Sequence, residues 1–239
     1  MDFSITSVET IPNLHCLAAF TPKTTEVFKE TEDTAPVPIN DKMQYMPWGH
    51  DNNMPYYILE LIESDETLST CQQFNAEMCY GAGIQYVTES ATAQVKQEVD
   101  DFLLDNDLTT YFFSVSQDFK HFGFCISVII LNREGKKIVR LQCKEACYCR
   151  FAPADGSGKI SYILYANWRR VSTDNQVEKI EALDPYAPFS DLKARLENGT
   201  KKRKFAIITR IPTPDSTYYP IPYYASLFKG KWYSIKRLI

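Results

Sequence analysis

The segment FCISVIILNREG, residues 124–135, marks a change from helical to extended periodicity along this chain. Residues 124–131 form an apolar run, rich in β-branched side chains, that has the length of one strand. The Asn-Arg-Glu-Gly sequence at 132–135 favours a turn, so a partner strand is expected at 137–144. This hairpin is expected to begin an antiparallel sheet.

Four more extended patterns follow this hairpin, and a short helix separates the last two. The helix is expected at 190–198, where Ser190 can cap it and Gly199 ends it. The strands are expected at 147–152, 160–168, 177–182 and 205–209.

Helical periodicity dominates the residues before 123. Asn52 or Asn53 can cap a first helix, because Pro55 then falls in the first turn, where its missing N–H is not needed. Three more helices are expected, one starting after Asp65, one spanning 91–105 and one starting after Asp107.

The helix that starts after Asp65 carries a stripe that the sequence predicts to be buried. The helix is expected to stop at Gly81-Ala82-Gly83, because glycine readily takes the backbone conformation that ends a helix. The stripe consists of Leu68, Cys71, Phe74, Asn75, Met78 and Cys79.

These patterns predict an α+β fold in which a helical amino-terminal layer packs on an antiparallel sheet. Residues 1–40 contain four prolines and a polar run, so we expect an extended arm there. Residues 41–210 are expected to form the α+β domain. Residues 211–239 are expected to be a Pro-rich connector and a helical segment, and their apolar end predicts a natural continuation beyond Ile239.

Composition narrows the class of protein. The chain is 44% hydrophobic, which is enough for a sizeable core, and it lacks an apolar run of membrane-spanning length or a signal-peptide pattern. The seven cysteines are scattered and odd in number, so we interpret them as buried thiols of a cytosolic protein. A net charge of -4 counts against a protein that works mainly by gripping phosphates.

Catalytic and metal-binding patterns are weak. Cys143, Cys147 and Cys149 lie close together, but a structural zinc site needs a second pair of ligands elsewhere in the chain, so we expect no metal. We also expect no cofactor and no catalytic residue. An uncharacterised intracellular enzyme stays open as an alternative, and its candidate groups are His50 with Asp51, or His121 with Cys125.

One dense basic segment invites a different alternative. Lys201, Lys202, Arg203 and Lys204 precede the last expected strand. Such a run is usually a solvated turn, but it could also contact nucleic acid. The second alternative function is therefore a nucleic-acid-binding module.

Two segments resemble phage portal proteins of bacterial prophages. The first is Pro47-Trp48-Gly49-His50-Asp51-Asn52-Asn53-Met54-Pro55, followed by the two helices and the Tyr80-Gly81-Ala82-Gly83-Ile84 turn. The second is Tyr218-Tyr219-Pro220-Ile221-Pro222-Tyr223-Tyr224-Ala225-Ser226-Leu227. The resemblance directly covers only these segments, and portal subunits are usually much longer, so the chain is expected to be a fragment or a prophage remnant.

The resemblance implies a portal wing-like fold and a structural role as head-to-tail connector. It implies a homo-oligomeric ring of about a dozen subunits at one capsid vertex, through which DNA passes without sequence specificity. Capsid protein, terminase and head-completion proteins are the implied partners, and the implied location is the virion, after assembly in the bacterial cytoplasm. The motif residues, expected to shape the fold rather than perform chemistry, are Trp48, Gly49, Asn53, Pro55, Gly81, Gly83, Pro220 and Pro222.

Overall fold

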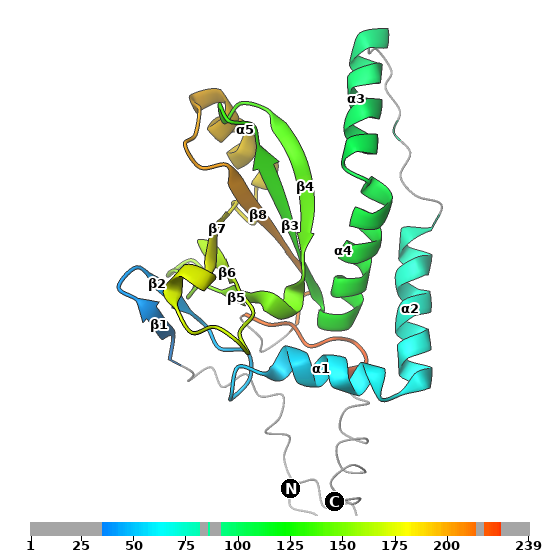
Figure 1. Cartoon of the computed structure of the whole chain (residues 1–239), viewed down its shortest axis with the longest axis vertical. Helices are drawn as coiled ribbons and strands as arrows, with labels where there is room; N and C mark the ends of the chain where they lie inside the picture. Colours follow the sequence, from blue (N-terminus) through cyan, green and yellow to red (C-terminus); the bar gives the residue numbers. More distant parts are fainter. Residues whose placement is uncertain (1–34, 82–85, 87–91, 214–217, 226–239) are drawn as a thin grey trace, which may run out of the picture.

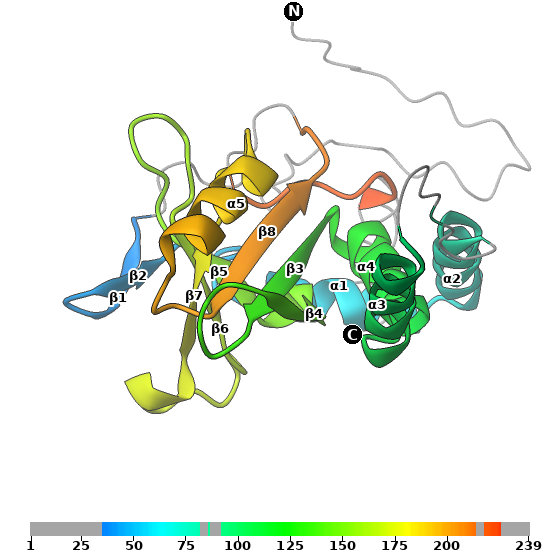
Figure 2. The same ribbon diagram turned by 90° about the horizontal axis from the view of Figure 1, so that it is seen from above.

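A curled, six-stranded sheet forms the centre of the molecule, which is an α+β fold as predicted (Figure 1). The computed structural model describes residues 35–81, 86, 92–213 and 218–225. Helix α1 lies across one end of the sheet, while α2, α3 and α4 stand together at its side. Seen from above, α5 covers part of one face of the sheet (Figure 2).

The sheet has the strand order β4-β3-β8-β7-β6-β5 and is mostly antiparallel. The predicted hairpin is present, and β3 occupies an interior position with every apolar residue from Phe124 to Ile129 buried. The strands are β3 Phe124–Leu131, β4 Ile138–Lys144, β5 Cys149–Phe151, β6 Tyr162–Tyr165, β7 Glu178–Ala182 and β8 Lys204–Arg210.

One pair of strands departs from the antiparallel prediction. Strands β7 and β8 are parallel, with Glu181 opposite Phe205 and Ala182 opposite Ala206. Helix α5, Pro188–Asn198, connects them, because parallel neighbours need a crossover that carries the chain back to the starting end. The sheet is therefore mixed.

Helices α2 and α4 begin at the predicted caps, Asp65 and Asp107, whereas α3 begins at Thr92, which the sequence analysis did not single out. The side chains of Asp65, Thr92 and Asp107 each accept a hydrogen bond from a backbone N–H of the first turn. Two 3₁₀ turns lie between strands: η1 Ala146–Tyr148 between β4 and β5, and η2 Asp174–Gln176 between β6 and β7. The helices other than α5 are α1 Met54–Glu63, α2 Glu66–Tyr80, α3 Ala93–Asp105 and α4 Leu108–Phe122.

The predicted buried stripe of α2 is wrong. Leu68 is buried, but the residues that α2 buries beside it are Gln72 and Ala76, four and eight positions further on. Helix α4 packs on this face, where the small Ala76 side chain allows a close approach. Five of the stripe residues are exposed instead: Cys71, Phe74, Asn75, Met78 and Cys79.

The largest apolar cluster lies between α1, the end of α4 and the sheet. It joins side chains of residues 46–68, 122–128, 146–163 and 219–225, with Ile180 and Ala206, so segments from both ends of the described chain meet there. A separate cluster under α5 contains Ile129, Leu131, Leu183, Leu192 and Phe205. The described residues therefore form one main core and smaller clusters, one of which lies on the α5 side.

The structure describes only part of the expected amino-terminal arm and of the expected carboxy-terminal segment. A hairpin of β1 Val37–Asn40 and β2 Met43–Tyr45 lies beside β6, where the Tyr162 hydroxyl bonds to the backbone of Gln44. Residues 1–34 of the expected arm, Gly83 and the expected helical turns after Ala225 lie outside the described residues. No helix that the structure describes is both long and apolar enough to cross a bilayer.

Two expected strands are shorter in the structure. Cys147 lies in a 3₁₀ turn rather than in a strand with Cys149, because β5 starts only after η1. The expected strand 160–168 is reduced to β6, preceded by a bridge between Ala154 and Ile160. Both cysteines are nevertheless buried.

Candidate functional site

The two segments that resemble portal proteins meet in the main core. The indole of Trp48 stacks on the ring of Tyr219, with ring centroids 4.6 Å apart and planes 3° apart. Phe122 and Phe124 contact other sides of the same indole, and Phe151 stacks on Tyr219 at 5.0 Å. We call this cluster the Trp48–Tyr219 junction.

The loop that carries Trp48 is held by backbone turns of unusual conformation. Gly49 and Asn52 both have positive φ, 78° and 60°. A Cβ atom on Gly49 would lie 2.9 Å from Cβ of Met54, so this position suits only glycine. The Asn52 side chain accepts a hydrogen bond from the backbone N–H of Trp48, which closes the loop.

Arg150, on β5, fixes this loop from inside the protein. Its side chain is fully buried and donates to the side chain and the backbone carbonyl of Asn52. It also donates to the carbonyls of Cys147 and Cys149, at 3.0 and 2.8 Å. Burial lowers the pKa of the guanidinium, but arginine stays charged at neutral pH.

Two indole rings flank the Arg150 guanidinium. Its carbon lies 5.6 Å from the centre of the Trp48 ring and 5.3 Å from that of Trp168. Neutral carbonyls, an amide and aromatic faces thus surround this charge, which is a favourable setting for a planar, weakly hydrated cation. The arrangement fixes backbone geometry and does not present the guanidinium to a ligand.

The second motif segment is tied to the sheet through its tyrosine hydroxyls. The Tyr219 hydroxyl donates to the carbonyl of Met46 at 2.7 Å and accepts from the N–H of Phe151 at 3.2 Å. Tyr218 accepts from the N–H of Ala154, and Tyr224 donates to the carbonyl of His121. Polar contacts therefore orient the rings that the junction buries.

The prolines of this segment are buried with it. Pro220 packs close to Gly123, since a Cβ atom there would lie 3.3 Å from Cγ of the proline. Pro222 is also buried, and its carbonyl accepts the N–H of Ala225. Neither proline exposes a surface for a ligand.

The predicted cap of α1 is only partly right. Asn53 occupies the cap position, but its side chain makes no capping bond and instead donates to Asp51. Its backbone carbonyl accepts from Tyr56 and Tyr57. Pro55 stands in the first turn, as predicted, and Gly81 ends α2 with a φ of 57°.

The candidate groups for catalysis form other contacts. Asp51 accepts a hydrogen bond from the Tyr57 hydroxyl at 2.7 Å, and its neighbour His50 is exposed. Burial lowers the pKa of His121 and raises the pKa of the Cys125 thiol to about 12. A thiol with that pKa is almost entirely protonated at neutral pH and is a poor nucleophile.

Asp118 is a half-buried acid that the sequence analysis missed. It lies on α4 and accepts from the N–H of Ala146 at 2.8 Å and from the thiol of Cys143 at 3.8 Å. Burial raises the pKa of its carboxyl to about 7. Within the part of the chain that the structure describes, no three His, Cys, Asp or Glu side chains are grouped as metal ligands.

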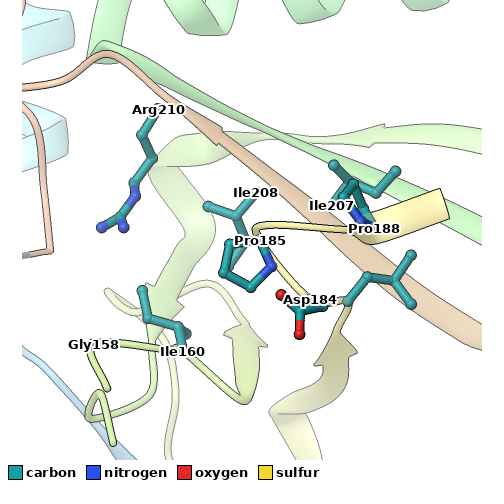
Figure 3. Close-up of a pocket in the computed structure, with 9 residues that line it drawn as sticks. Gly158, Ile160, Asp184, Pro185, Pro188, Ile207, Ile208 and Arg210 are labelled. Carbon is teal, nitrogen blue, oxygen red and sulfur yellow. The ribbon is translucent and has the colours of Figure 1, made fainter. Parts of the chain in front are cut away.

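A small cavity lies between the turn before β6, the loop before α5 and the edge of β8 (Figure 3). Its volume is about 50 Å³, room for a water molecule or two rather than for a substrate, because ligand sites usually enclose several hundred Å³. Asp184 at its rim pairs with Lys159 at 2.8 Å. We assign no ligand to this cavity.

The basic residues 201–204 are exposed, as expected for a turn. Lys202 and Lys204 form ion pairs with Glu181 and Glu178, which lie on β7.

Comparison of the sequence with models of protein families and with curated proteins gives no match. The site must therefore be interpreted from its own geometry.

Proposed function

We propose that this chain is a structural subunit, or part of one, of a phage portal ring that forms a conduit for DNA at the capsid vertex. The observation that carries the proposal is the stacking of Trp48 on Tyr219. These residues belong to two separate segments that resemble the same family and stand 171 positions apart in the sequence. Because the two segments contact each other, their resemblance to the family is better explained by one folded unit than by two unrelated sequence matches.

The role of the motif residues supports a structural function. Gly49, Asn52 and Arg150 fix backbone geometry, while Trp48 and Tyr219 fill the core. None of these groups points a reactive atom at a cavity of substrate size. A scaffold subunit needs such a rigid unit more than it needs reactive groups.

Exposed apolar side chains on α2 support contact between copies. Phe74 is 58% and Met78 65% exposed, and Cys71 lies three residues before Phe74 on the same helical face. Exposed apolar stripes of this kind mark interaction surfaces. In a ring this stripe would meet a different surface of the next subunit, since closed rings are built from head-to-tail interfaces.

The partners follow from the proposed role. Capsid protein would surround the ring, while terminase and head-completion proteins would bind it before and after DNA packaging. DNA would pass through the ring without sequence-specific contacts. The ring would assemble in the bacterial cytoplasm and belong to the virion.

The test is the absolute mass of the purified chain, measured by light scattering over a range of concentrations. We expect assemblies many times heavier than the 27.5 kDa chain, with ring outlines in negative-stain electron microscopy. Phe74→Glu with Met78→Glu should shift the mass toward the monomer. Tyr186→Glu, at an 83% exposed site near α5, is the matched control and should leave the mass unchanged.

One outcome would contradict the proposal, and another would correct only the position of the interface. A wild-type chain that stays monomeric at every concentration would remove the support for a ring subunit. Assembly that survives the α2 substitutions would retain the ring but place its contacts elsewhere.

A further inference from the structure

The structure places a second basic loop beside the basic segment 201–204. The turn between β3 and β4 contributes Arg133, Lys136 and Lys137, and Figures 1 and 2 show this turn at the same end of the sheet as the loop from α5 to β8. We call residues 132–137 and 199–204 together the basic end. More than sixty residues separate these two loops in the sequence, so neither loop alone predicts the combined basic surface.

Backbone contacts lock the two loops together. The N–H of Leu131 donates to the carbonyl of Arg203 at 2.8 Å. Gly135 lies so close to Thr200 that a Cβ atom on it would be 2.3 Å from the threonine carbonyl oxygen. Each loop is also braced internally: the Asn132 side chain accepts from the N–H groups of Lys136 and Lys137, and the Thr200 hydroxyl accepts from the N–H of Lys202.

The basic end carries a strong local positive charge in an acidic protein. It presents seven exposed Lys and Arg side chains and a single acidic one, Glu134. Lys202 and Lys204 are neutralised by glutamates of β7. The others form no ion pair with any residue that the structure describes: Arg133, Lys136, Lys137, Lys201 and Arg203.

The chemistry of this surface favours a phosphate backbone over an acidic protein. Protein interfaces have an apolar, often aromatic centre and few lysines. The two loops, Asn-Arg-Glu-Gly-Lys-Lys and Gly-Thr-Lys-Lys-Arg-Lys, contain no apolar side chain that could form such a centre. They also contain no aromatic ring that could stack on an unpaired base.

We propose that the basic end binds the phosphate backbone of double-stranded nucleic acid without sequence specificity. Flexible cations on two fixed loops can follow a duplex backbone, and their binding releases condensed counterions. This inference does not rest on the proposed portal function, because the surface exists in a single copy of the chain. It adds a contact site for nucleic acid outside the Trp48–Tyr219 junction.

The test is fluorescence anisotropy of a labelled DNA duplex of about 25 base pairs, titrated with the full chain at several salt concentrations. We expect a Kd of about 10⁻⁴–10⁻⁶ M near physiological salt, with the same value for duplexes of unrelated sequence. The affinity should fall steeply as the salt concentration rises. Lys136→Glu with Lys137→Glu, and separately Lys201→Glu with Arg203→Glu, should each weaken binding at least about tenfold at low salt. Each removed phosphate contact should also lower the logarithmic salt slope by about 0.9.

The control is Lys96→Glu with Arg170→Glu. Both residues are exposed and do not belong to the basic end, since they lie on α3 and in the segment after β6, and the pair changes the net charge by the same amount. It should keep most of the affinity, and unchanged thermal unfolding of all variants should show that the loops are still folded.

Three outcomes would overturn the inference. The first is no binding by the wild type at low salt, and the second is equal weakening by the control and the loop variants. The third is a loop variant that changes the mass in light scattering but not the DNA affinity, which would assign the surface to an acidic protein partner. Because light scattering measures assembly independently of DNA, failure here is distinguishable from failure of the ring proposal.

Discussion

Arg150 holds the Trp48 loop because its side chain donates hydrogen bonds to Asn52 and to the carbonyls of Cys147 and Cys149. We predict that Arg150→Met lowers the free energy of unfolding by about 3–5 kcal/mol, because it leaves buried carbonyls without donors. Arg150→Lys should recover only part of this loss, since one ammonium cannot reproduce the planar fork. Urea unfolding followed by tryptophan fluorescence measures both changes.

The matched control for this prediction is Arg133→Met, because Arg133 is an exposed arginine without an ion pair among the described residues. It should change the unfolding free energy by less than about 0.5 kcal/mol. If Arg150→Met were equally mild, the guanidinium would not be what holds the loop.

Asp118 makes the stability depend on pH in an unusual direction. Its folded pKa, about 7, lies above the ordinary value of 3.8, because burial disfavours the charged carboxylate. Between these values the carboxyl is protonated in the folded chain and ionised in the unfolded chain, so folding takes up a proton. The contribution of Asp118 to stability therefore falls as the pH rises from about 4 to 7, and the full cost persists above pH 7.

We predict that Asp118→Asn stabilises the protein relative to wild type, increasingly from pH 5 to pH 7. The asparagine keeps an acceptor for the N–H of Ala146 but cannot ionise. The difference in unfolding free energy should grow by at most about 1.4 kcal/mol per pH unit. A difference that stays constant with pH, in urea titrations of both proteins, would show that the Asp118 carboxyl titrates normally.

At the scale of elements, Asn106 covers part of the open edge of the sheet. Strand β4 lies at this edge, and the buried side chain of Asn106 accepts from the N–H of Leu141 at 2.9 Å. The same side chain donates to the carbonyl of Phe102 at 2.8 Å, so it links the end of α3 to the strand. An unpaired edge strand is a template for unwanted pairing, and Asn106 blocks part of it.

We predict that Asn106→Ala lowers the unfolding free energy by about 1–3 kcal/mol, because the half-buried N–H of Leu141 loses its acceptor. The amide of Leu141 should exchange its hydrogen faster, which hydrogen-exchange mass spectrometry measures. Asn75→Ala, at an exposed site on α2, is the control and should have little effect. Unchanged exchange at Leu141 would mean that the backbone bond does not need this side chain.

The sequence predicted the existence of most elements but not how they pair. Local chemistry was enough for the β3–β4 hairpin and for the caps at Asp65 and Asp107, because turns and caps depend on neighbouring residues. The face of α2 was mistaken, since periodicity identifies an apolar stripe but not the helix that will cover it. The parallel pair could have been foreseen, because a helix between two strands is the signal of a crossover.

At the scale of the whole molecule, the candidate site shows the same limit. Trp48, Gly49, Pro220 and Pro222 were selected from the sequence as residues that shape the fold, and all of them contribute to or flank the junction. Arg150 was missed, because a lone arginine in a strand gives no local sign of burial. The basic end was half predicted, since its two loops approach each other only in the folded chain.

The Trp48–Tyr219 junction should couple the two ends of the described chain energetically. Trp48→Leu and Tyr219→Leu should each cost less than the about 3–5 kcal/mol of a full aromatic truncation to alanine. Their effects should not be additive, because the stacked pair is already lost in either single variant. We predict a coupling energy of about 0.5–1.5 kcal/mol in a double-mutant cycle of urea unfolding.

A second cycle tests whether this coupling is specific to the junction. This cycle combines Trp48→Leu with Leu192→Ala. Trp48 lies in the main core and Leu192 in the separate cluster under α5, so the two effects on the unfolding free energy should add within about 0.5 kcal/mol. Additivity in both cycles would mean that Trp48 and Tyr219 merely share a core and that the two portal-like segments do not stabilise each other. Since the proposed function rests on those segments acting as one unit, that result would weaken it directly, whereas coupling confined to the first cycle would support it.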